Sequence, residues 1–213
     1  MKMFCNQCEQ TARGKGCDVS GVCGKQPEIA ALQDIIIHQL LGIGCLAHAK
    51  LKNGNVDDYV NNFTIEALFS TVTNVNFDAD RLEQIIKKGE EIRDGLLKSF
   101  KDVSAMPEVV FFKPATSSRA QLLDQATQVG LLSGPDSEDV RSLKMLLRFG
   151  LKGMAAYTDH AYILGKKDDA VFAFFHEALA ALADPLITVE NLVDLNMRCG
   201  KTNIRTMEIL HEG

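Results

Sequence analysis

The sequence has no cluster of basic residues. It carries 23 Lys and Arg against 28 Asp and Glu, giving a net charge of −5, and the basic residues are scattered along its length. Proteins that bind nucleic acid usually gather such residues on one face, where they meet the phosphates. The sequence therefore predicts no nucleic-acid partner.

Long apolar runs are also missing. The first residues lead straight into cysteines without the apolar core of a signal peptide, and no apolar run approaches the roughly 18 residues that would span a bilayer. These absences predict a soluble, cytoplasmic protein without a membrane partner. Because the cytosol keeps thiols reduced, a dense group of cysteines there is more typical of a metal site than of disulfides.

The sequence lacks strand-like alternation of apolar and polar residues. Apolar residues repeat instead every three or four positions, which is the spacing of amphipathic helices. Before residue 105 this pattern predicts three helices, the first starting at Pro27 and the third capped by Asp78. Their apolar stripes run over 27–53, 60–75 and 82–100.

The helical pattern breaks between residues 106 and 114, where two prolines enclose at most a short extended piece at 109–112. Helical stripes resume over 122–129, 140–164, 171–182 and 192–210, with Thr188 capping the last and Gly200 expected to kink or interrupt it. We therefore predict an all-α protein of two helical bundles in series, formed by residues 27–105 and 115–213 as one compact domain. Residues 1–26, called the cysteine segment below, precede the bundles.

Four of the six cysteines lie in this segment, with the spacing C-x2-C-x8-C-x5-C: Cys5, Cys8, Cys17 and Cys23. The spacing is compact enough for all four thiolates to converge on one centre. A structural zinc site usually takes its ligands from two short knuckles, and here only the first pair has that form. An iron–sulfur cluster is wider and suits a glycine-rich loop, whose N–H groups can approach the sulfurs. Spacing alone leaves both occupants open.

Three other residues need an interpretation. Cys45 and Cys199 fall in predicted helices, and because free cysteine is among the most buried residue types we expect both to be buried thiols. His160 follows Tyr157 by three residues and could line a pocket. Because no ligand partners flank it, we expect His160 to be a packed, hydrogen-bonded helical residue.

The cysteine segment resembles a known family. The stretch MFCNQCEQTARGKGCDVSGVCGKQPEIAALQD is similar to the N-terminus of the hybrid cluster proteins, also called prismane proteins. GLKGMAAYTDHAYILG, then FFHEAL, and finally NIRTMEIL are similar to later stretches of that family's first domain, so the resemblance covers nearly the whole chain. It implies that the four segment cysteines ligate a 4Fe–4S cluster, and that the helices form two three-helix bundles.

The family pattern also extends beyond this sequence. Its members continue into two α/β domains that hold a hybrid cluster, at which hydroxylamine or nitric oxide is reduced, whereas this sequence closes on MEILHEG. We therefore expect a one-electron carrier that works with a redox partner protein or by self-association, and that is not a catalyst on its own. Two alternatives are a regulatory module that senses oxygen or nitric oxide, and a subunit of a split hydroxylamine-reductase-like enzyme.

Overall fold

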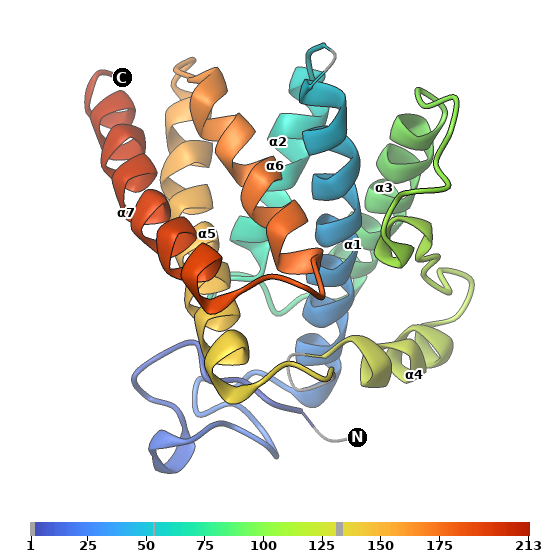
Figure 1. Ribbon diagram of the computed structural model, residues 1–213. Coiled ribbons are helices and arrows are strands. Elements are labelled where there is room, and N and C mark those ends of the chain that lie inside the picture. The colour runs from blue at the N-terminus through green and yellow to red at the C-terminus, as the bar shows by residue number, and fades with distance from the viewer. Residues whose placement is uncertain (1–2, 53, 131–133) are drawn as a thin grey trace.

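The computed structural model describes residues 3–52, 54–130 and 134–213; Asn53, at the predicted end of the first helix, lies outside them. These ranges contain helices and no strand, so the all-α prediction is confirmed (Figure 1). The short 3-10 helices are η1 (Ala12–Gly14) and η2 (Glu108–Phe111). The α-helices are α1 (Pro27–Leu51), α2 (Asp58–Ser70), α3 (Ala79–Leu97), α4 (Arg119–Val129), α5 (Glu138–Ile163), α6 (Asp169–Ala183) and α7 (Val189–His211).

Helix α1 lies at the centre of the fold and contacts α3, α4 and α6 (Figure 1). Helix α2 packs chiefly against α5, and α5 in turn packs against α7. Helices from both halves of the chain therefore share one continuous apolar core. The arrangement as two bundles in series is not confirmed, because α1 and α2 bury their apolar faces against helices of the second half.

The composition of α1 matches its central position. An 18-residue window of this helix has a mean hydropathy of 1.6, so by length and composition alone it could cross a membrane. The window is apolar on average, but Asp34, His38 and Gln39 interrupt it, so it is not a continuous apolar run. Of that window, 83% is buried inside the protein, because the helix is apolar on nearly every side and is covered on each of them.

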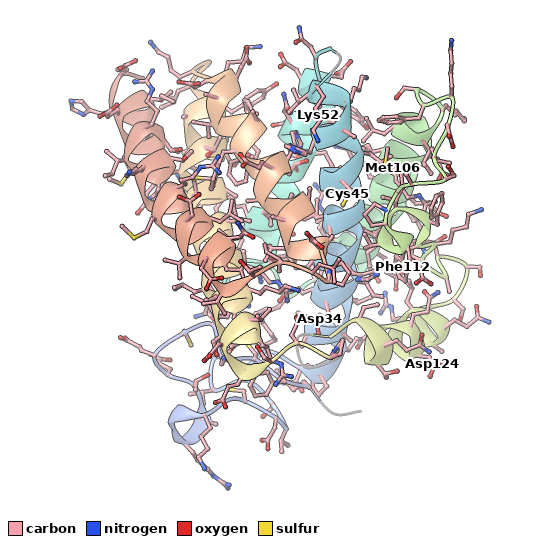
Figure 2. All side chains as sticks on the ribbon, viewed as in Figure 1. Asp34, Cys45, Lys52, Met106, Phe112 and Asp124 are labelled. Atoms are coloured by element: carbon pink, nitrogen blue, oxygen red, sulfur yellow. The ribbon has the colours of Figure 1, made fainter. Side chains whose placement is uncertain are left out.

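The connection between the two halves packs on α1. The sequence suggests at most a short extended piece at 109–112, but residues 108–111 form η2, and Val110 is completely buried. A Cβ atom at Gly42 of α1 would lie 2.7 Å from the carbonyl oxygen of Val109, so only glycine allows this close approach. Phe112 follows η2 (Figure 2), and its ring packs edge-on against His38, with centroids 4.6 Å apart.

Two predicted helix caps are confirmed, and a predicted break is not. Asp78 Oδ1 accepts a hydrogen bond from Arg81 N at 3.1 Å, and Thr188 Oγ1 accepts one from Asn191 N at 3.2 Å. Helix α7 runs without interruption through Gly200. The prediction of a kink there overweighted glycine, whose cost inside a helix of about 1 kcal/mol is small beside the burial of the apolar face of α7.

Candidate metal centre

The cysteine segment folds back on itself beside the N-terminal ends of α1 and α5 (Figure 1). Cys5 and Cys17 form an isolated antiparallel bridge, in which Cys5 N donates to Cys17 O at 3.1 Å and Cys17 N donates to Cys5 O at 2.8 Å. Thr11 Oγ1 donates to Cys5 O at 3.2 Å, and Thr11 N donates to Cys8 O at 3.2 Å. These bonds hold three of the four predicted ligands in one small loop system.

The sulfur of Cys17 lies in an environment that favours a thiolate. Its side chain is buried, and Ala12 N donates to Cys17 Sγ at 3.5 Å. The hydrogen bonds from the backbone N–H groups of Ala12 and Val22 lower the pKa of the Cys17 thiol, against the opposing effect of burial. Because the thiolate is the form that binds metal, these N–H groups prepare Cys17 as a ligand.

The sulfur of Cys23 lies so close to Gly21 that any larger residue at position 21 would displace it. A Cβ atom at Gly21 would lie 3.0 Å from Cys23 Sγ and 2.9 Å from Lys25 Cβ. Gly21 N also donates to Lys25 O at 2.7 Å, which closes the turn around Cys23. The backbone thus approaches this sulfur as closely as a cluster-binding loop requires.

The four sulfurs are near one another in the chain but are not assembled as a complete ligand set. Within residues 3–52, 54–130 and 134–213, no three Cys, His, Asp or Glu side chains are grouped closely enough to hold a metal ion. All six cysteines are free thiols. The donors nevertheless fit an iron–sulfur centre chemically, because they are soft thiolates in a loop whose N–H groups point at sulfur.

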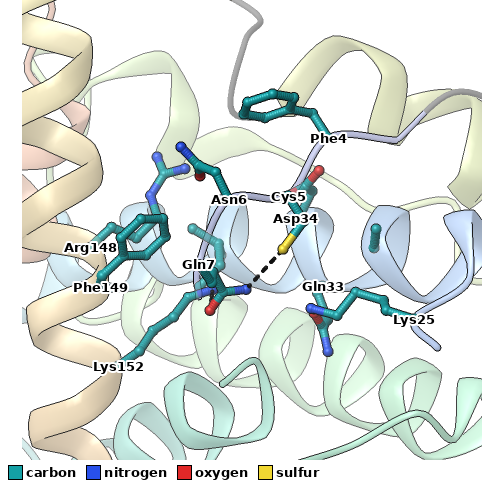
Figure 3. Close-up of a pocket in the computed structure, with 12 residues that line it drawn as sticks. Phe4, Cys5, Asn6, Gln7, Lys25, Gln33, Asp34, Arg148, Phe149 and Lys152 are labelled. Atoms are coloured by element: carbon teal, nitrogen blue, oxygen red, sulfur yellow. Dashed lines mark hydrogen bonds between the residues drawn. The ribbon is translucent and has the colours of Figure 1, made fainter. Parts of the chain in front are cut away.

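A small polar cavity of about 30 Å³ lies directly behind Cys5, between the cysteine segment, α1 and α5 (Figure 3). Its charged lining residues are Lys25, Asp34, Arg148 and Lys152. Burial, together with the charges of Arg148 and Lys25, lowers the pKa of Lys152 to about 7. Burial raises the pKa of Asp34 to about 6, although Lys152, Arg148 and Lys25 all act to lower it.

Comparison with known proteins places this site in a family. The model of the Prismane/CO dehydrogenase family matches residues 3–213, which include the whole described cysteine segment. The chain belongs to the Prismane/CO dehydrogenase family. This confirms the resemblance to the hybrid cluster proteins that the sequence motifs indicated.

Several relatives in the prismane family are close to this chain over its full length. It is 44% identical to the hydroxylamine reductase of Geobacter sulfurreducens, over 100% of this chain and 40% of that protein. It is 49% identical to the hydroxylamine reductase of Syntrophobacter fumaroxidans, over 98% of this chain and 39% of that protein. The Methanocella arvoryzae protein of the same name is 42% identical over 99% of this chain and 40% of that protein. The chain spans about 40% of the length of the curated relatives it matches.

The other candidate residues of this prismane-family chain lie away from the cysteine segment. Cys45 and Cys199 are buried, as expected, and burial raises the pKa of each thiol to about 11, so neither is prepared to ligate a metal. His160 lies exposed on α5 and packs edge-on against Phe69, with ring centroids 5.6 Å apart. The expected packing of His160 is found in this ring contact, whereas the expected side-chain hydrogen bond does not occur among the described residues.

Sequence reasoning missed the charged groups behind Cys5. Lys152 follows Arg148 by about one helical turn of α5. Asp34 interrupts the apolar helix α1, between the buried Gln33 and Ile35. Charged residues at core-facing positions of two helices were the available signal, because such residues are almost never buried without a partner.

Proposed function

We propose that the four segment cysteines hold a 4Fe–4S cluster, and that the chain moves single electrons through it to or from a redox partner. The observation that carries the proposal is the setting of Cys17 Sγ, which is buried and receives N–H groups from Ala12 and Val22. Such donors stabilise the negative charge of a cluster and its thiolates. A zinc ion could use the same thiolates, but the wide spacing after the first pair and the glycine-lined approach to Cys23 favour the larger occupant.

When bound, the cluster would supply a reversible one-electron couple. The chain's own residues would bind its iron through sulfur, exclude water and present it to a partner. Met3 and Ala30 pack around Cys17 and keep water from one side of the segment. Val19 and Val22 are 76% and 60% exposed on the loop that carries Cys17 and Cys23, and exposed apolar residues beside a redox centre favour a protein partner or a second copy of the chain.

We further propose a cytoplasmic location without nucleic-acid or membrane partners. The net charge of −5 argues against a nucleic-acid partner, and the burial of α1 argues against a membrane partner.

A second candidate function is the reduction of hydroxylamine, which the names of the relatives favour. In this proposal the chain contributes the electron-carrying cluster, and protein outside residues 1–213 contributes the substrate site. Purified residues 1–213 should then exchange one electron per cluster with reduced viologen, without saturable turnover of hydroxylamine. Saturable turnover that Cys5→Ser abolishes would contradict this division of roles.

The ligand assignment is tested by single serine substitutions, with protein purified anaerobically. Cys5→Ser, Cys8→Ser, Cys17→Ser and Cys23→Ser should each lose iron or change the visible absorption spectrum, because serine replaces a thiolate ligand. Cys45→Ser and Cys199→Ser are the matched controls and should keep both iron content and spectrum. A segment variant with full iron and an unchanged spectrum would remove that cysteine from the ligand set.

A further inference from the structure

Two lysine side chains are buried beside the cysteine segment and donate to neutral groups. Lys25 and Lys152 are only 2% and 6% exposed. Lys25 Nζ donates to Gln33 Oε1 at 2.6 Å. Lys152 Nζ donates to Gln7 Oε1 at 3.3 Å and to Thr71 O at 3.4 Å. Among the residues that the structure describes, neither ammonium forms an ion pair, so hydrogen bonds satisfy their protons while their charges lack a direct counter-charge.

The charge balance of the cavity behind Cys5 is positive. Three cationic side chains line it, from Lys25, Arg148 and Lys152, against the single carboxylate of Asp34. The Nε atom of Arg148 is also buried without a hydrogen-bond partner in the described part of the chain. Burying an unpaired charge costs free energy, so negative charge close by would stabilise this arrangement. The cavity volume of about 30 Å³ has room for a water molecule but not for a larger anion.

Cys5 lies in the wall of this cavity, and its sulfur would carry negative charge as a ligand of the cluster. Gln7 connects this residue with Lys152, because its Oε1 accepts from Lys152 Nζ and its Nε2 donates to Cys5 Sγ in a long contact of 3.9 Å (Figure 3). An ammonium on the carbonyl side of an amide draws electron density from the NH₂ group, which strengthens its hydrogen bond to sulfur. The polarised amide of Gln7 therefore extends the electrostatic effect of the Lys152 ammonium to the sulfur of Cys5.

We infer that Lys152, acting through Gln7, is a positioning residue that sets the electron affinity of the cluster bound at Cys5. The inference rests on the proposed function. One-electron reduction adds one negative charge to the cluster and its thiolates, and buried positive charge next to a ligand sulfur stabilises that reduced form. The step needs no proton and no further ligand, so its balance is one electron in and one negative charge gained.

The first test is the reduction potential of Lys152→Met, measured by redox titration under electron paramagnetic resonance on anaerobically purified protein. At pH 6, where Lys152 with its pKa of about 7 is mostly protonated, removing the charge should lower the cluster's affinity for an electron about tenfold, which is about 59 mV more negative for a one-electron couple. The control is Lys201→Met, which removes an equal charge from an exposed position on α7 and should leave the potential unchanged. Iron and sulfide are counted first for every variant.

A second variant keeps the inference testable if Lys152→Met takes up no cluster. Gln7→Leu removes the contact to Cys5 Sγ at a half-buried loop position and should shift the potential in the same direction by a smaller amount. In the double variant the shift in potential should be smaller than the sum of the two single-variant shifts, because both substitutions interrupt the same Lys152–Gln7–Cys5 contact. Gln7→Leu or Lys152→Met with full iron and the wild-type potential would overturn the inference. A wild-type chain without iron would instead overturn the proposed function, and this inference with it.

Discussion

The cysteine segment and the helical body of this protein are stabilised in different ways. The body buries apolar side chains from all seven α-helices in one continuous core. Residues 3–26 contribute only Met3 and Cys17 to a small separate cluster with Ala30 of α1, flanked by Cys5 and Ala12. The segment is attached to the body mainly through polar contacts, such as that of Asn6 Nδ2 with Met145 Sδ at 3.7 Å.

This difference indicates what each region needs in order to fold. The body has enough apolar burial to be stable without a ligand. The segment does not, and short chain segments with so little core usually depend on disulfides or a metal centre. Because its cysteines are free thiols, we expect the order of the segment to depend on the cluster. The predictions below separate the two regions, beginning with the largest effect.

Removal of the cluster should unfold the segment and leave the body folded. After iron chelation, backbone amides of residues 3–26 should exchange with deuterium at least about 100-fold faster, because their few hydrogen bonds lose the centre that fixes them. Amides in the buried parts of α1 and α6 should keep their protection. Hydrogen-exchange mass spectrometry measures both regions in one sample, and equal loss of protection in both would contradict the separation.

Acid should destabilise the body through His176, which lies in the core of α6. His176 Nε2 donates to Asn61 Oδ1 at 2.8 Å, and burial, followed by the nearby charge of His48, lowers the pKa of His176 from 6.5 to about 4. Between these values the unfolded chain binds more protons than the folded one, so stability falls as the pH drops from 6.5 towards 4. The expected loss from this group is about 3 kcal/mol.

The variant His176→Gln isolates this effect. Urea unfolding of the cluster-free body at pH 6.5 and at pH 4 should show a smaller loss of stability in the variant than in the wild type. The opposite contribution of Asp34, whose pKa is raised to about 6, is common to both proteins and cancels in the difference. Identical pH dependence would mean that His176 does not carry the acid sensitivity.

A smaller loss is expected where the connection between the halves meets α1. Gly42→Ala would place a methyl group 2.7 Å from Val109 O, so η2 must move away from α1. Overpacking of this kind costs about 1–3 kcal/mol of unfolding free energy, measurable by urea denaturation. The cluster should be unaffected, because Gly42 lies in the body. Loss of iron from this variant would show that the two regions are coupled.

The smallest effect is a gain in stability. A Cβ atom at Gly200 meets nothing within 4 Å, and the residue lies inside the continuous helix α7. Gly200→Ala should therefore stabilise the body by about 1 kcal/mol, because alanine favours the helix. A decrease in the midpoint of thermal unfolding would mean that α7 bends at this glycine in solution.

Local sequence patterns predicted much of this fold because the signals involved are themselves local. Apolar spacing located the helices, and side-chain caps at Asp78 and Thr188 were recognised from residue type. The packing of α2 against α5, and the close approach of η2 to Gly42, depend on contacts between distant segments, which spacing does not encode. The 3-10 turn at 108–111 was missed for the same reason, since Val110 is fixed by its burial against other segments.

The candidate site was predicted in part. The cysteines stood out because four thiols within nineteen residues are unusual, and the family match includes them. The positive groups behind Cys5 did not stand out, because Lys25 and Lys152 are 127 positions apart in the sequence. Only the packing of α1 and α5 against the segment brings them to one cavity (Figure 3).

The central claim is that the segment cysteines hold a 4Fe–4S cluster, and the most direct test is the metal content of the anaerobically purified chain. Iron and acid-labile sulfide should each be found at about four per chain, with an electron paramagnetic resonance signal of a one-electron-reduced cluster after dithionite treatment. One zinc ion per chain, with no sulfide and no such signal, would contradict the account.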